Sequence, residues 1–244
     1  MPPDQLAIAE IWVYLSATPL FALLLTLGAY AIGLFIYDRT QRNPLANPVL
    51  IAIVVIASTL ALIDMPYPTY FEGAQFVHFL LGTATVALAI PIYKGWASVR
   101  GRVTILLIGM LLGGATSIIV VVGVLGWFEV DPTLIRAMLA KSVTAPIAMG
   151  VAERIDASPT LTAVFAVTTG VLGAVLGRFV LNAVGVKTWW QRGFALGVAA
   201  HGIGTSRAFS VNPTAGAYAS LGMGMHGIAG AILIPVVASW WVIQ

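Results

Sequence analysis

The chain has 244 residues, of which 59% are hydrophobic and 9% charged, with a formal net charge of +3 and no cysteine. Its mean hydropathy is +0.97. A soluble domain carries about 25% charged residues, so this composition excludes a soluble protein and predicts an integral membrane protein. The absence of cysteine excludes disulfides and thiol chemistry, and the basic residues form no run that would indicate nucleic-acid binding.

The apolar stretches predict an all-α membrane protein with about eight transmembrane spans. A helix needs about 20 apolar residues to cross the hydrocarbon core. The first stretch lacks a basic n-region and a small-residue cleavage site, so we expect a retained helix rather than a signal peptide. In chain order the predicted spans are roughly 11–37, 47–65, 69–98, 102–127, 132–155, 159–182, 189–209 and 214–243.

Charges between the spans predict the orientation. Basic residues mark cytoplasmic loops, and Arg39, Arg102 and Arg154 fall in alternate connections. This places both termini outside in a multi-pass protein of a bacterial inner membrane. Lys187 and Arg192 break the pattern, because they fall in a connection predicted to be outside. Either that connection is misplaced, or the two charges serve another purpose.

Short polar patches interrupt the third, fifth and seventh spans. They begin at Gly82, Lys141 and His201, and each contains small hydroxyl residues, glycine or proline. Irregular backbone is tolerated in a membrane only where protein buries it or a wet cavity faces it, so we expect discontinuous helices. The regular spacing suggests helix-pair repeats within a single transmembrane domain, and repeat interfaces commonly hold a transporter's substrate. The repeats are predicted at 47–98, 101–155 and 159–209 of the domain 1–244; they are parallel if every span crosses and inverted if one patch is a re-entrant hairpin.

Lys141 is the strongest candidate for a functional charge. It lies about 13 Å along a helix from Pro132, and a lysine near the membrane centre costs about 2.5–3.5 kcal/mol. Pro146 lacks an N–H and would leave the carbonyl of Ser142 without its partner. The second half of such a broken helix presents free N–H groups that favour an anion. Snorkelling of Lys141 and a kink without function are the alternatives.

Four hydroxyl residues accompany the first two patches. Thr83, Thr85, Ser142 and Thr144 can orient the oxygens of a small hydroxy acid. Alternatively, each hydroxyl bonds to the backbone one turn earlier, as is common in membrane helices.

The third patch carries a histidine and an arginine around two glycines. His201 can titrate near neutral pH, which suits proton coupling, and Arg207 can bind a carboxylate bidentately or anchor a helix end by snorkelling. Gly202 and Gly204 permit close backbone approach, and Thr205 follows them.

The sequence gives no indication of an enzyme. It has no metal-ligand cluster, nucleophile elbow or phosphate loop, so no catalytic residue, metal or cofactor is expected. The other two histidines, His78 and His226, stand alone among apolar residues and are interpreted as structural.

Four segments in register resemble the LrgB/CidB family of bacterial membrane proteins. They are 66–73 (PYPTYFEG), 82–89 (GTATVALA), 141–149 (KSVTAPIAM) and 201–208 (HGIGTSRA). The resemblance extends from about residue 10 to 240. Gly150, Phe209–Ser210 and His226 depart from the family pattern, and at the first two places the family has carboxylates.

The resemblance implies two functions of different class. The family is described as antiholin-like and is linked to murein-hydrolase control and cell lysis. It also includes the C-terminal half of the plastidal glycolate/glycerate translocator of plants, and bacterial relatives are connected to movement of small carboxylates such as pyruvate. Many members are encoded beside a smaller LrgA/CidA partner.

The leading hypothesis is therefore a carrier of small monocarboxylates or hydroxy acids, coupled to protons or another cation, and the alternative is an antiholin-like regulator. A homo-oligomer and an LrgA/CidA-like partner are expected with either. A carrier needs charge enclosed within one protomer, whereas a holin-like assembly needs it at subunit interfaces or along a wide pore. The predicted binding residues for a small organic anion are Lys141, Ser142, Thr144, Pro146, Thr83, Thr85, His201, Gly202, Gly204, Thr205 and Arg207.

Overall fold

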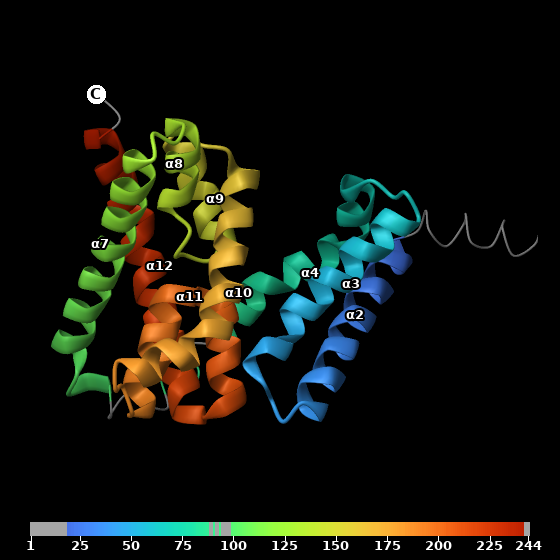
Figure 1. Ribbon diagram of the computed structural model, residues 1–244, viewed down its shortest axis with the longest axis horizontal. Helices are drawn as coiled ribbons and strands as arrows, with labels where there is room; N and C mark the ends of the chain where they lie inside the picture. Colours follow the sequence, from blue (N-terminus) through green and yellow to red (C-terminus); the bar gives the residue numbers. More distant parts are fainter. Residues whose placement is uncertain (1–18, 88–89, 91–92, 94–98, 242–244) are drawn as a thin grey trace, which may run out of the picture. The chain divides into compact units, whose positions relative to one another are not determined.

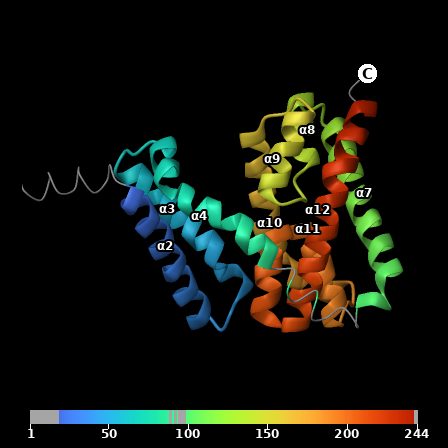
Figure 2. The same cartoon turned by 180° about the vertical axis from the view of Figure 1, so that it is seen from behind.

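The computed structural model describes residues 19–87, 90, 93 and 99–241, and every regular element in these ranges is a helix (Figures 1 and 2). The chain divides into two compact units, 1–87 and 88–244. Each unit is described by itself below.

The first unit is a small helical group. Its elements are α2 (Pro19–Arg39), η1 (Pro44–Ala46), α3 (Pro48–Leu62) and α4 (Tyr67–Ala87). Glycine allows the close contact of α2 with both neighbours: a Cβ at Gly33 would lie 2.5 Å from the Pro48 carbonyl oxygen, and one at Gly73 would lie 2.7 Å from Ala22 Cβ. The hydroxyls of Thr26 and Tyr70 lie 2.7 Å apart and tie α2 to α4.

The second unit contains the polar patches that begin at Lys141 and His201. Its elements are α7 (Val103–Trp127), α8 (Pro132–Leu139), α9 (Ala145–Arg154), α10 (Pro159–Ala183), α11 (Trp189–Val211) and α12 (Pro213–Trp241). The start of α7 lies beside the first turn of α11 and the second turn of α12, since the Arg102 guanidinium is 5.3 Å from the Trp190 ring and 3.4 Å from the Tyr218 hydroxyl. Arg192, in the first turn of α11, reaches Asn182 at the end of α10. Helix α7 therefore begins on the side where α10 ends.

Helices α8 and α9 form a re-entrant hairpin rather than a span. Because α7 and α10 are antiparallel, the short connections 128–131 and 155–158 lie at the same end of the unit, which is the upper end in Figure 1. Helix α8 has 8 residues and α9 has 10. Each arm is thus about 12–15 Å long, half of a hydrocarbon core about 30 Å thick. The segment 140–144 turns the chain back near the middle.

Helix α11 is a second hairpin, entering from the other end. His201 has φ 39° and ψ −129°, which no helix adopts, and it divides α11 into arms 189–200 and 202–211. Both arms pack on the start of α12: a Cβ at Gly197 would lie 2.0 Å from the Ala219 carbonyl oxygen, and one at Gly216 would lie 2.1 Å from Phe209. The two ends of α11 therefore lie on the same side.

The prediction of about eight spans is not confirmed. Within the described ranges four helices are long and apolar enough to cross a membrane, namely α2, α7, α10 and α12, while α3 is shorter. The predicted fifth and seventh spans are the two hairpins. Their total apolar length resembles that of a span, but the break at the middle reverses the chain. The helix-pair repeats stay a prediction.

The acidic residues of the second unit lie at one of its two ends. All four acidic residues that follow position 99 (Glu129, Asp131, Glu153 and Asp156) lie near the 128–131 and 155–158 connections. Lys187 lies at the opposite end, together with Arg102 and Arg192. Lys187 and Arg192 thus fall on the side of Arg102, because the re-entrant α8–α9 segment changes the side of the next connection. Arg154, at the end of α9, becomes the basic residue that departs from the pattern. We call the end of the unit where α7 and α11 begin and α10 ends the basic end.

Candidate functional site

The break between α8 and α9 is built by local sequence signals. Helix α8 begins at Pro132, capped by Asp131, whose Oδ1 accepts from the backbone N–H and the hydroxyl of Thr133. Those two hydrogen bonds hold the pKa of the Asp131 carboxyl below its usual range. Helix α9 begins after Thr144 with Pro146 in its first turn, where the missing N–H costs nothing. The chain between the helices, 141–144, is the irregular segment that the sequence predicts.

Lys141 occupies the apex of this hairpin and is held by serines. Its Nζ donates to Ser117 Oγ on α7 at 2.5 Å, and Ser117 Oγ lies 2.6 Å from Ser142 Oγ. Lys141 is half-buried, and Ser142 is buried. No ion pair with Lys141 occurs among the described residues. The Nζ group is therefore oriented by a neutral hydroxyl group, and the ion pairs of the described residues include no carboxylate partner for it.

Two cavities meet at these serines. A cavity of about 630 Å³ lies between α7, the hairpin apex and the first arm of α11, with Lys141, Thr169 and Gln191 as polar lining groups beside apolar ones. A smaller one of about 270 Å³ lies between α7 and α12. Ser117 and Ser142 line both. Ligand pockets are usually about 300–1,000 Å³, mostly apolar and fitted with few polar groups, which describes the larger cavity.

His226 lies on the smaller cavity, opposite the serines. It is 6% exposed, and its Nε2 has no hydrogen-bond partner among the described residues. Its ring is within electrostatic range of both Lys141 and His201. A Cβ at Gly114 would lie 2.9 Å from its Cε1, so glycine makes room for the ring. The interpretation of His226 as a structural residue is therefore incomplete, because His226 also lines the same cavity as Ser117 and Ser142.

The apex of α11 is sealed. His201 is 4% exposed, and its Nε2 lies 2.8 Å from the Ala166 carbonyl oxygen on α10. A Cβ at Gly170 would lie 2.7 Å from the His201 ring, and a Cβ at Gly173 would lie 2.5 Å from Ala200 Cβ. A positive φ at a residue other than glycine is strained backbone that tight surroundings must hold. None of the three described cavities is lined by His201.

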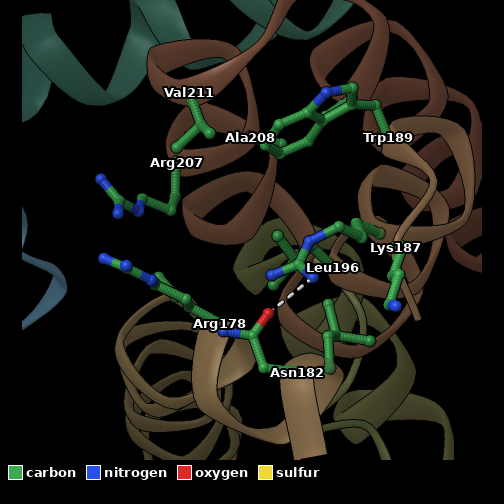
Figure 3. Close-up of a pocket in the computed structure, with 12 residues that line it drawn as sticks. Arg178, Asn182, Lys187, Trp189, Leu196, Arg207, Ala208 and Val211 are labelled. Carbon is green, nitrogen blue, oxygen red and sulfur yellow. Dashed lines mark hydrogen bonds between the residues drawn. The ribbon is translucent and has the colours of Figure 1, made fainter. Parts of the chain in front are cut away.

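Arg207 lies apart from Lys141. It lines a third cavity, of about 410 Å³, at the basic end of the unit, together with Arg178, Lys187 and Arg192 (Figure 3). The structure therefore brings together Lys141 and Ser142 of the predicted site, but gives Arg207 different neighbours.

The other predicted residues are more dispersed. Thr83, on α4 of the first unit, is exposed and donates to the Leu80 carbonyl oxygen at 2.8 Å, the backbone-bonded alternative. Thr85 also lies on α4, but its side chain is outside the described residues, as is most of the segment 88–98. Pro146 is exposed, and Thr144 is half-buried.

The glycines of the third patch serve the hairpin itself. A Cβ at Gly204 would lie 2.6 Å from the Leu196 carbonyl oxygen on the opposite arm, whereas one at Gly202 would meet only Met223 Sδ, at 3.9 Å. Thr205 is buried, and its hydroxyl points to Met223 Sδ at 3.9 Å.

Sequence reasoning missed several site residues. Ser117 ends a run of small residues, 113–117, inside an otherwise apolar helix, and that run was the available signal. Arg178, Lys187 and Arg192 gave a second signal, because Lys187 and Arg192 broke the charge pattern. Among the described residues, no group of three or more histidine or acidic side chains is placed to hold a metal ion.

Comparison with known proteins places these features in a family. The model of the LrgB-like family matches residues 26–240. Holin-like protein CidB of Staphylococcus epidermidis is 31% identical over 214 residues, covering 88% of this chain and 93% of that protein. The uncharacterized protein YwbG of Bacillus subtilis is 32% identical over 219 residues (90% and 97%), and CidB of Staphylococcus aureus is 30% identical over 220 (89% and 94%). No solved structure matches. The resemblance seen in the sequence is confirmed: the chain belongs to the LrgB-like family.

Proposed function

We propose that this protein acts as a holin-like membrane protein that regulates murein-hydrolase activity and cell lysis. The observation that carries the proposal is its similarity, over nearly all of its length, to proteins named holin-like protein CidB. The apolar surfaces of its long helices, such as Phe79, Leu112 and Trp127, suit a lipid environment. The proposal includes insertion in a bacterial inner membrane, a homo-oligomer and a smaller LrgA/CidA-like partner.

Expression in a bacterial host tests this role. Induction should change the rate of autolysis and the murein-hydrolase activity on zymograms relative to an empty vector, with and without a co-expressed LrgA/CidA-like protein. Unchanged lysis and unchanged hydrolase activity in both backgrounds would contradict the proposal.

A second candidate is a carrier of small monocarboxylates or hydroxy acids, and one observation favours it. Lys141 lies at a helix break on the wall of a cavity of about 630 Å³ that the helices of one protomer form. In water-poor surroundings a single ammonium is a strong partner for a carboxylate. Ser117 accepts a hydrogen bond from the Nζ group and exchanges one with Ser142, and the two hydroxyls can form hydrogen bonds with a hydroxy acid.

The carrier mechanism follows from the apex geometry. A carboxylate entering the larger cavity would replace one hydrogen bond of Lys141 and neutralise its charge, which lowers the cost of the buried ammonium. The free N–H groups at the start of α9 add positive potential next to the same break. His226 lines the smaller cavity together with Ser117 and Ser142, and cation coupling would require proton exchange at its ring.

Uptake into proteoliposomes tests the carrier. Wild-type protein with an imposed pH gradient should accumulate labelled glycolate, glycerate or pyruvate, and Lys141→Ala should lose at least about tenfold of the initial rate, the value of one charge-assisted hydrogen bond. Arg100→Gln, which removes an exposed charge elsewhere, is the matched control. Absence of uptake for every acid would contradict the carrier, and normal uptake by Lys141→Ala would contradict the site.

A further inference from the structure

Several cationic side chains line the cavity at the basic end of the second unit, and neither proposed function assigns them a role. It measures about 410 Å³ and is lined by Arg178, Asn182, Lys187, Arg192 and Arg207 among apolar residues. These side chains come from the end of α10, the 184–188 connection and both arms of α11. In Figure 3, Arg178 and Arg207 extend toward the same side of the cavity, and Lys187 lies on the other.

Arg192 forms a fixed wall of this cavity. It donates to Asn182 Oδ1 at 2.8 Å and to the Val186 carbonyl oxygen at 2.7 Å, and its guanidinium lies 5.9 Å from the Trp189 ring. These partners are all neutral. They orient the guanidinium without reducing its charge.

None of the described residues that line the cavity is acidic. The four acidic residues that follow position 99 lie at the opposite end of the unit. Like charges around one cavity repel each other, and a bound anion with several oxygens would relieve that repulsion.

The volume and the position of the cavity limit the class of ligand that it can bind. The volume suits a group of small-molecule size. The cavity lies at helix ends beside Trp189, the level of interfacial aromatic residues and lipid headgroups, and basic pockets between membrane helices bind phospholipid headgroups. A monocarboxylate carries one charge and two oxygens, whereas a phosphate offers more of both to guanidinium groups.

We propose that this cavity binds a phosphate group, presented either by the headgroup of an anionic phospholipid or by small soluble phosphate. The site is separate from the Lys141 apex. Its occupancy can be measured without any assay of uptake or lysis.

Two binding experiments with the full chain test the proposal. In the first arm, native mass spectrometry compares binding of phosphatidylglycerol and phosphatidylcholine to the protein in neutral detergent. In the second, calorimetry measures inorganic phosphate against chloride at equal ionic strength. The test variant is Arg178→Gln with Lys187→Gln, both exposed positions that cap no helix. The control, Arg100→Gln with Arg154→Gln, removes the same charge from two residues that do not line the cavity.

Wild type should bind at least one probe. The test variant should bind it at least about tenfold more weakly, because two charge-assisted contacts are lost, and the control should bind like wild type. A response to phosphatidylglycerol alone assigns the site to lipid, and a response to inorganic phosphate alone assigns it to a soluble ligand. No binding of either probe by wild type, binding by the test variant equal to wild type, or equal weakening in both variants would overturn the proposal.

Discussion

The two re-entrant hairpins share a shape but differ in what their apices contact. The α8–α9 apex places a charged side chain, Lys141, against serine hydroxyls on the wall of a large cavity. The α11 apex buries His201 against a backbone carbonyl and lines its arms with glycine. The first apex therefore presents a charged side chain to a cavity, whereas the second is tightly packed.

Glycine packing of the α11 hairpin should show the largest effect. Gly197→Ala places a methyl group about 2.0 Å from the Ala219 carbonyl oxygen, and backbone cannot yield as a flexible side chain can. We expect a loss of about 3 kcal/mol or more in unfolding free energy, measured by thermal or denaturant unfolding in detergent. Gly224→Ala, on α12, meets nothing within 4 Å and should be neutral or stabilising by helix propensity. Equal effects of the two substitutions would refute the packing account.

The two apex side chains should respond differently to truncation. His201→Ala removes a buried ring and its hydrogen bond to Ala166, so we expect about 2–3 kcal/mol of lost stability. Lys141→Ala removes a desolvated charge together with its hydrogen bond, effects that oppose each other, so we expect less than about 1 kcal/mol. The same unfolding measurement compares them. If Lys141→Ala lost as much stability as His201→Ala, Lys141 would also have a structural role.

Coupling between Lys141 and Ser117 should be measurable. Ser117→Ala removes the acceptor of the Nζ hydrogen bond at 2.5 Å, for an expected cost of about 1 kcal/mol. A double-mutant cycle with Lys141→Ala should give a coupling energy of about 0.5–1.5 kcal/mol. Additive effects would show that the two groups do not interact in the folded protein.

The smallest effect concerns the entrance of the α8–α9 hairpin. Hydrogen bonds from Thr133 lower the pKa of the Asp131 carboxyl, so its folded pKa lies below its unfolded pKa. Its stabilisation is therefore present at neutral pH and is lost as pH falls through the lowered pKa. The melting temperature of wild type should exceed that of Asp131→Asn at about pH 7, and the difference should shrink as the pH falls below the ordinary pKa of an aspartate. A difference independent of pH would show that charge plays no part.

Part of the site was predictable, because a charged side chain or a proline inside a membrane helix carries a large free-energy cost. Lys141 and Pro146 stand out for that reason, and the break they predict is present. The direction of the chain after the break was not predictable, since a crossing and a hairpin need the same apolar length. Ser117 and the cluster around Arg178 also escaped prediction, because their partners come from other helices and only packing brings them together. Lys187, a basic residue in a connection predicted to be outside, was the sequence signal that the chain turns back at the α8–α9 hairpin.

Side-specific labelling tests the hairpin architecture most directly. The chain has no cysteine, so single cysteines can be introduced at Gly101, Phe128, Glu153 and Val184 and labelled with an impermeant maleimide in intact cells and in inverted vesicles. We predict that Phe128→Cys and Glu153→Cys label from one side, and Gly101→Cys and Val184→Cys from the other. Labelling of Phe128→Cys and Glu153→Cys from opposite sides would contradict the account, because it would mean that the segment carrying Lys141 crosses the membrane.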